Sequence, residues 1–169
     1  MDSLFELDSN DYDESLPINE SVTVRAVIVV NHLIAVQQAD NGMCKLIGGG
    51  VEENEDHIDT LTREVEEEAG LLLDTNSVIL IGNSIEKHLD IFDKNSIFLR
   101  KTYYYGCRVF DAELETNLTE SEQAAGFTLT FMSIDDIIEA NKDFMDKSWI
   151  ERDTRFLTII KENPDLLFG

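Results

Sequence analysis

The sequence predicts an α+β fold in which a mixed β-sheet lies between helices, with one long acidic helix against the sheet. Three observations support this prediction. Strand-like apolar runs occur on both sides of one segment with helical periodicity, and further helical patterns follow near the end of the chain. Elements in this order pack as layers around one core, and 169 residues fit one domain.

The charge of the chain is strongly negative. It has 13 Lys and Arg against 35 Asp and Glu, a formal net charge of −22. This surplus repels phosphate backbones and anionic headgroups, so we expect neither a nucleic acid polymer nor a membrane as partner. Carboxylates are also the hard oxygen ligands that divalent cations prefer. Where the acidic residues lie in the sequence therefore matters more than the total charge.

Targeting and membrane signals are absent from the sequence. The two cysteines have no Cys-x-x-Cys spacing, and no basic start precedes an apolar stretch. The longest apolar stretch, residues 22–36, contains Arg25 and is shorter than the ~20 residues of a spanning helix. We therefore expect a cytoplasmic protein without a membrane span.

The first 20 residues predict an acidic arm before a single domain over residues 21–169. The arm holds seven acids and no Lys or Arg, although Phe5 and Leu7 are apolar enough to dock on the edge of the domain. Regular structure is predicted to start at Ser21.

Three strands are predicted next. Residues 22–30 are rich in β-branched side chains, which favours a buried strand. A turn at residues 31–32 leads to a second strand over 33–39. Asp-Asn-Gly at 40–42 is typical of a hairpin turn, so residues 43–47 form the third strand.

A long acidic helix follows three consecutive glycines. Between residues 51 and 69, apolar side chains recur at the helical period, at Ile58, Leu61, Val65 and Ala69. We predict Asn54 as the N-cap, Glu55 and Asp56 in the first turn, and Gly70 as the residue that ends the helix.

The rest of the chain continues the α+β pattern. Strands are predicted over 77–87, 97–110 and 127–132, and helices over 134–140, capped by Ser133, and over 149–162.

The long helix carries the residues most indicative of chemistry. Glu64, Glu67 and Glu68 are spaced so that they project from one helix face, where like charges repel unless a cation neutralises them. Mg²⁺ is the predicted cation, with Mn²⁺ as the alternative. The glycines before the helix can bring a carbonyl oxygen, that of Gly48, beside the carboxylates. Arg63 can pair with Glu67 or with Glu55.

Residues 49–71 reproduce the Nudix box, GX5EX7REUXEEXGU with U apolar, so the chain resembles the Nudix hydrolase family. The resemblance implies a Nudix-like α/β/α sandwich and hydrolysis of a diphosphate bond by water attack at phosphorus. The expected substrate is a small nucleotide, either a nucleoside diphosphate linked to another group or a nucleoside triphosphate. The alternative is a module of this fold that senses nucleotides or binds cations without catalysis.

The resemblance also implies roles for individual residues. The implied metal ligands are Glu64, Glu67, Glu68 and the carbonyl of Gly48, and the implied orienting pair is Arg63 with Glu55. The general base is Glu64 or an acid in a loop beyond the box. Glu120 and Glu122 are the candidates there, and we favour Glu122 among them.

Substrate specificity is expected outside the box. Tyr103 and Tyr105 should share one face of their strand, with Tyr104 on the other. The pair is predicted to stack on a base, although ordinary half-buried strand residues would give the same pattern. Family members often form dimers, so a homodimer through the last helix and the acidic arm remains open beside a monomer.

Overall fold

The computed structural model describes residues 2–168. Seven strands form one mixed sheet in the order β1-β5-β6-β2-β4-β3-β7. The strands are β1 (Phe5–Asp8), β2 (Ile18–Val30), β3 (Leu33–Gln38), β4 (Cys44–Gly50), β5 (Leu72–Leu89), β6 (Ile97–Phe110) and β7 (Thr128–Met132). The β1–β5 and β2–β6 pairs are parallel, whereas the other pairs are antiparallel.

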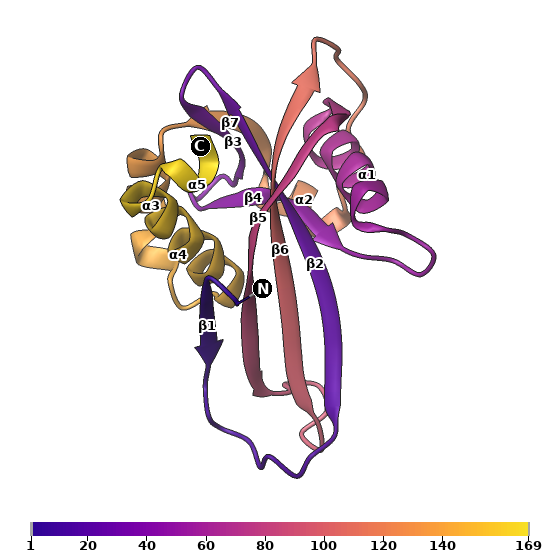
Figure 1. Ribbon diagram of the computed structural model, residues 1–169, viewed down its shortest axis with the longest axis vertical. Helices are drawn as coiled ribbons and strands as arrows, with labels where there is room; N and C mark the ends of the chain where they lie inside the picture. Colours follow the sequence, from indigo (N-terminus) through magenta and orange to yellow (C-terminus); the bar gives the residue numbers. More distant parts are fainter. Residues whose placement is uncertain (1, 169) are drawn as a thin grey trace.

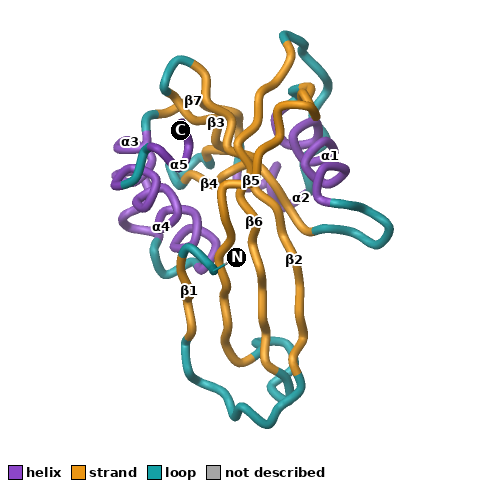
Figure 2. The backbone as a smooth tube through the Cα atoms, viewed as in Figure 1, coloured by secondary structure: helices purple, strands orange, loops and turns teal. Residues whose placement is uncertain are grey.

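Helices cover both sides of this sheet (Figure 1). The helices are α1 (His57–Ala69), α2 (Glu120–Ala125), α3 (Ile134–Asn141), the 3₁₀ helix η1 (Lys142–Phe144), α4 (Ser148–Glu162) and α5 (Asp165–Phe168). Helix α1 lies on one side of the strands and α3, α4 and α5 lie on the other, while the strands β2, β5 and β6 extend beyond them (Figure 2). The predicted α/β/α sandwich with a mixed sheet is confirmed.

Two apolar cores lie on the two sides of the sheet. In β2, Ala26 and Ile28 face a core that includes Leu61 of α1, whereas Val27 faces a core that includes Phe156 of α4. The alternation follows from the two-residue period of a strand. The β-branched run is therefore buried on both faces, as its composition predicts.

The predicted start of regular structure at Ser21 is wrong. Residues Phe5–Asp8 form β1, which pairs in parallel with the edge of β5, and β2 begins at Ile18. Phe5 is buried. Pairing along a sheet edge satisfies backbone groups whatever the side-chain composition, so the acidic residues around β1 do not prevent it. The division into an arm and a domain remains a prediction.

The helix α1 begins two residues later than the sequence suggests. Asp56 is the N-cap: its carboxylate accepts from the backbone N–H of Asp59 (2.8 Å), and the Asp59 carboxylate accepts from that of Asp56 (3.1 Å). This capping box replaces the predicted cap at Asn54, which lies in a turn at a φ of 67°. Glu55 consequently lies before the helix rather than in its first turn. Gly70 ends the helix at a φ of 64°, as predicted.

The segment after β6 contains a helix that the sequence analysis missed. Residues Glu120–Ala125 form α2, with a capping box between Thr119 and Glu122. Glu120 and Glu122 therefore belong to a short helix and not to the predicted loop. In the part of the chain that the structure describes, no helix is long and apolar enough to cross a membrane.

Candidate active site

The carboxylate-bearing face of α1 lies over the glycine-rich end of β4. Leu61 and Val65 bury the arc of the helix that faces the core. A Cβ added at Gly49 would lie 2.2 Å from Oε1 of Glu64, so the side chain of Glu64 occupies the space that a larger residue would fill. The glycine at this position thus lets the helix place a carboxylate directly on the strand.

Arg63 links the carboxylates around this point. It donates from Nε and Nη2 to the two oxygens of Glu55, each over 2.9 Å. Its Nη1 lies 2.8 Å from Glu64 Oε1 and 3.4 Å from Glu67 Oε2. Both pairings left open by the sequence, with Glu55 and with Glu67, are therefore present. The hydrogen bonds from Arg63 hold the pKa of Glu55 below its ordinary value.

Replacing Arg63 by lysine is expected to lower the free energy of unfolding by about 1–2 kcal/mol, because an ammonium cannot reproduce the forked contact with Glu55. Urea denaturation measures the change. Arg108→Lys is the matched control, since Arg108 is exposed and its side chain makes no hydrogen bond or ion pair within the described residues. Equal stability of both variants would contradict a structural role for the fork.

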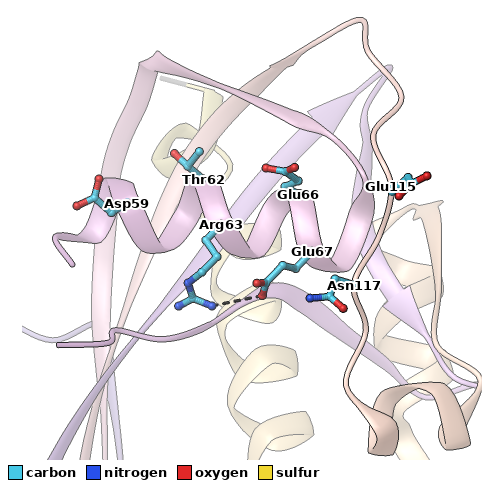
Figure 3. A pocket seen from close by; sticks show the side chains of 7 residues that line it. All are labelled: Asp59, Thr62, Arg63, Glu66, Glu67, Glu115 and Asn117. Carbon is cyan, nitrogen blue, oxygen red and sulfur yellow. Dashed lines mark hydrogen bonds and ion pairs between the residues drawn. The ribbon is translucent and has the colours of Figure 1, made fainter. Parts of the chain in front are cut away.

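An acidic cavity opens along the outer side of α1. It has a volume of about 500 Å³ and is lined by Arg63, Glu66 and Glu67 together with Glu115 and Asn117 from the segment after β6 (Figure 3). The backbone N–H of Asn117 donates to the carbonyl of Glu67 over 2.7 Å, which holds that segment against the helix. We call this space the acidic cavity.

Glu68 points away from the acidic cavity into a buried position. Its side chain is 4% exposed, and Lys45 Nζ lies 3.9 Å from its Oε2. That oxygen is buried and has no hydrogen-bond partner among the described residues. Burial raises the pKa of Glu68 to about 8, although the positive charges of Lys45 and Arg25 oppose the rise.

Lys45 also connects Glu68 to α2. Its Nζ lies 2.8 Å from Oε2 of Glu122. Glu122 in addition accepts from the backbone N–H of Thr119 over 2.9 Å as part of the capping box. Partial burial raises the pKa of Glu122, but the hydrogen bonds from Lys45 and Thr119 outweigh it and leave this pKa below its ordinary value. Glu120 is exposed.

The donor set fits a divalent cation, although the carboxylates are held by cationic side chains. Across residues 2–168, no three Asp, Glu, His or Cys side chains converge closely enough to hold a metal ion. Glu64 and Glu67 turn towards Arg63, and Glu68 lies towards Lys45. The unpartnered, buried oxygen of Glu68 nevertheless lacks a positive neighbour at bonding distance, which a cation would supply.

The tyrosines of β6 are arranged as the strand period requires. Tyr103 and Tyr105 pack on the side of α1, whereas Tyr104 is buried on the other side and stacks on Phe156 at a centroid distance of 3.9 Å. The ring of His57 lies 4.8 Å from that of Tyr103, and its Nδ1 lies 2.6 Å from the Tyr105 hydroxyl. Base stacking by Tyr103 and Tyr105 remains a prediction.

Sequence analysis missed Lys45 and Arg25, which lie beside the carboxylates. Each is a cation inside a run that otherwise reads as a buried strand. A charged side chain in such a run is rarely buried without a partner or a function. On that basis, both residues could have been predicted as candidates for the site.

The fold and the site together define a hydrolase of the Nudix type. A family model for the NUDIX domain matches residues 20–152. The chain therefore belongs to the NUDIX domain family, and the predicted class, a Nudix hydrolase, is confirmed at the level of the family.

Solved structures show the same fold. An ADP compounds hydrolase aligns with a TM-score of 0.57 and 17% identity, over 86% of this chain and 73% of that chain. A MutT protein from Bacillus halodurans aligns with a TM-score of 0.50 and 18% identity, over 78% of this chain and 80% of that chain. A search of curated proteins gave no match.

Proposed function

We propose that the chain is a divalent-metal-dependent pyrophosphohydrolase that cleaves a diphosphate bond in a small nucleotide by attack of water on phosphorus. The observation that carries this proposal is that Arg63 and Glu67 line the acidic cavity, while Arg63 also holds Glu64 and Glu55. Mg²⁺ is the proposed cation, with Mn²⁺ as the alternative.

Glu64, Glu67, Glu68 and the Gly48 carbonyl are the groups that would hold the metal. When bound, a divalent cation neutralises phosphate oxygens and makes water a better nucleophile. The contacts of Arg63 with Glu55 fix the position of its guanidinium, and through it the position of the Glu64 carboxylate. Arg63 therefore acts as a positioning residue and does not itself hold the metal.

We further propose Glu64 as the group that takes the proton from the attacking water. Its carboxylate lies on the backbone of Gly49 and receives one hydrogen bond from Arg63, so it has free acceptor capacity. Glu122 is less suited, because Lys45 and the capping box at Thr119 occupy its oxygens. The cytoplasmic location and the monomer or homodimer state stay predictions.

The proposal is tested by phosphate and pyrophosphate release from a panel of nucleoside triphosphates, nucleotide sugars and dinucleoside polyphosphates. We expect turnover of one class with Mg²⁺ and its loss in EDTA, with activity returning when excess Mg²⁺ is added. If no compound of the panel is hydrolysed although calorimetry shows Mg²⁺ binding, the alternative is favoured, a module of this fold that binds nucleotides or cations without catalysis. Turnover that persists in EDTA would contradict the metal requirement.

A further inference from the structure

A second cavity, of about 470 Å³, is lined by Lys45 and Glu122 among others and shares no lining residue with the acidic cavity. Three of the residues that line it are cations, Arg25, Lys45 and Arg100, and the one acid among its lining residues is Glu122. Lys45 is already paired with that acid at 2.8 Å. A concentration of positive charge is unexpected in a chain with a net charge of −22. We call this space the basic pocket.

Arg25 has no acid at bonding distance. The residue is 8% exposed, and within the described chain its guanidinium makes no hydrogen bond and no ion pair, although the charges of Glu68 and Asp153 act on it over a longer range. Its Nε is fully buried without a partner. Its side chain crosses Gly48: a Cβ added there would lie 3.0 Å from Arg25 Cδ. A buried charge without a partner is costly, so the pocket is built to receive an acceptor.

Arg100 is also without a carboxylate partner. Its Nε donates to the hydroxyl of Ser21 over 3.3 Å, and its guanidinium lies 4.9 Å from the centre of the Phe98 ring. The acids whose charges act on Arg25 and Arg100 are engaged by other cations: Glu86 and Asp153 by Arg152, at 3.5 and 3.0 Å, and Glu68 by Lys45, at 3.9 Å. Neither arginine on the wall of the pocket therefore has a carboxylate at bonding distance within the described residues.

Aromatic side chains complete the basic pocket. Trp149, at the start of α4, is 41% exposed, and Phe127 lies beside it in the lining with Lys45 Nζ 4.8 Å from its ring centre. Exposed indole rings offer a flat apolar face for a planar ring. The pocket therefore combines two unpaired guanidinium groups with a stacking surface.

We propose that the basic pocket binds a further phosphate group of the substrate together with its base, so that the enzyme prefers nucleoside polyphosphates to nucleoside diphosphates linked to a neutral sugar. This inference rests on the proposed function and names its substrate class. Guanidinium groups bind phosphate oxygens through paired hydrogen bonds. A neutral sugar would leave Arg25 buried, and Arg100 partly buried, without a phosphate acceptor, which disfavours its binding.

Lys45 and Arg25 connect the basic pocket to the carboxylates of α1. Lys45 lines the basic pocket, and its ammonium lies 3.9 Å from Glu68. Arg25 lies over Gly48, next to the glycine on which Glu64 rests. The charges of Lys45 and Arg25 both act on Glu68, so a phosphate group held at Arg25 would lie near an α1 carboxylate.

Binding of inorganic tripolyphosphate in EDTA tests the pocket without the metal reaction. Trp149 is the single tryptophan of the chain, so its fluorescence reports directly on ligand binding. We expect a saturable change for the intact protein, and Kd values raised at least tenfold in Arg25→Gln and in Arg100→Gln. Arg108→Gln, which changes an exposed arginine outside the pocket, should bind as the parent protein does.

Steady-state kinetics in the presence of Mg²⁺ provide the second test. The two pocket variants should raise KM for a nucleoside triphosphate at least tenfold. KM for a sugar-linked nucleoside diphosphate should rise by a much smaller factor, because this substrate shares the base but lacks the further phosphate. Absence of tripolyphosphate binding to the folded parent protein, or equal KM changes for both substrates, would overturn the assignment. Binding in EDTA without any hydrolysis would instead overturn the proposed function and keep the pocket as an anion site.

Discussion

Glu68→Gln is expected to abolish turnover and, at the same time, to stabilise the metal-free protein. The carboxylate of Glu68 is buried, its Oε2 has no hydrogen-bond partner in the described structure, and Lys45 is 3.9 Å away. Glutamine keeps the shape without the charge, so the cost of burying an ion disappears. We expect roughly 1–3 kcal/mol of added stability in EDTA and a loss of activity beyond 10³-fold.

The stability gain should depend on pH. Below the ordinary glutamate value of 4.5, the folded and unfolded states both carry the proton, and Glu68 costs nothing. Between that value and the raised pKa of about 8, the unfolded state ionises first, so the free energy of unfolding falls as pH rises. Urea denaturation of the metal-free proteins at several pH values should show this decline in the parent and a smaller one in Glu68→Gln.

Glu67→Gln is the matched control. Like Glu68, Glu67 is a carboxylate of α1 that is proposed to hold the metal. Its side chain, however, is 34% exposed and lies 3.4 Å from Arg63. Turnover should be lost as in Glu68→Gln, whereas the stability of the metal-free protein should change by less than about 0.5 kcal/mol. Activity retained in either variant would remove that residue from the proposed ligand set.

The two variants separate what local periodicity can predict from what it cannot. The helical period predicts Glu64, Glu67 and Glu68 on one helix face, but the structure divides them. Glu64 and Glu67 lie at Arg63, whereas Glu68, seven residues after Leu61 and so on nearly the same side of the helix, is buried. The contact of Glu68 with Lys45 is made between β4 and α1. A residue-by-residue pattern along one helix holds no information on that contact.

Tertiary pairing also explains the other differences. β1 forms because the edge of β5 offers it unpaired backbone groups, and no local composition signals that edge. The capping boxes at Asp56 and Thr119 are local signals that the sequence does contain. Arg25 and Arg100 form the basic pocket from two strands far apart in the chain, joined in the parallel pairing of β2 with β6.

The three consecutive glycines before α1 give the most discriminating test of how the site is built. Gly48 has a φ of 151°, and a Cβ there would lie 2.0 Å from the carbonyl oxygen of Val24. That oxygen belongs to the backbone of a paired strand and cannot yield. Gly48→Ala should therefore lose about 3 kcal/mol or more of stability, measured by urea denaturation.

Gly49→Ala should damage catalysis instead of folding. Its Cβ would lie 2.2 Å from the carboxylate of Glu64, the mobile end of a side chain that can move aside. We expect kcat to fall about 10²-fold through the displaced carboxylate, with stability within about 0.5 kcal/mol of the parent. Gly50→Ala meets nothing within 4 Å and should preserve both properties. Full activity in Gly49→Ala would show that catalysis does not need Glu64 at this position. Equal losses of activity and stability in all three variants would show instead that the glycines matter for the flexibility of the chain.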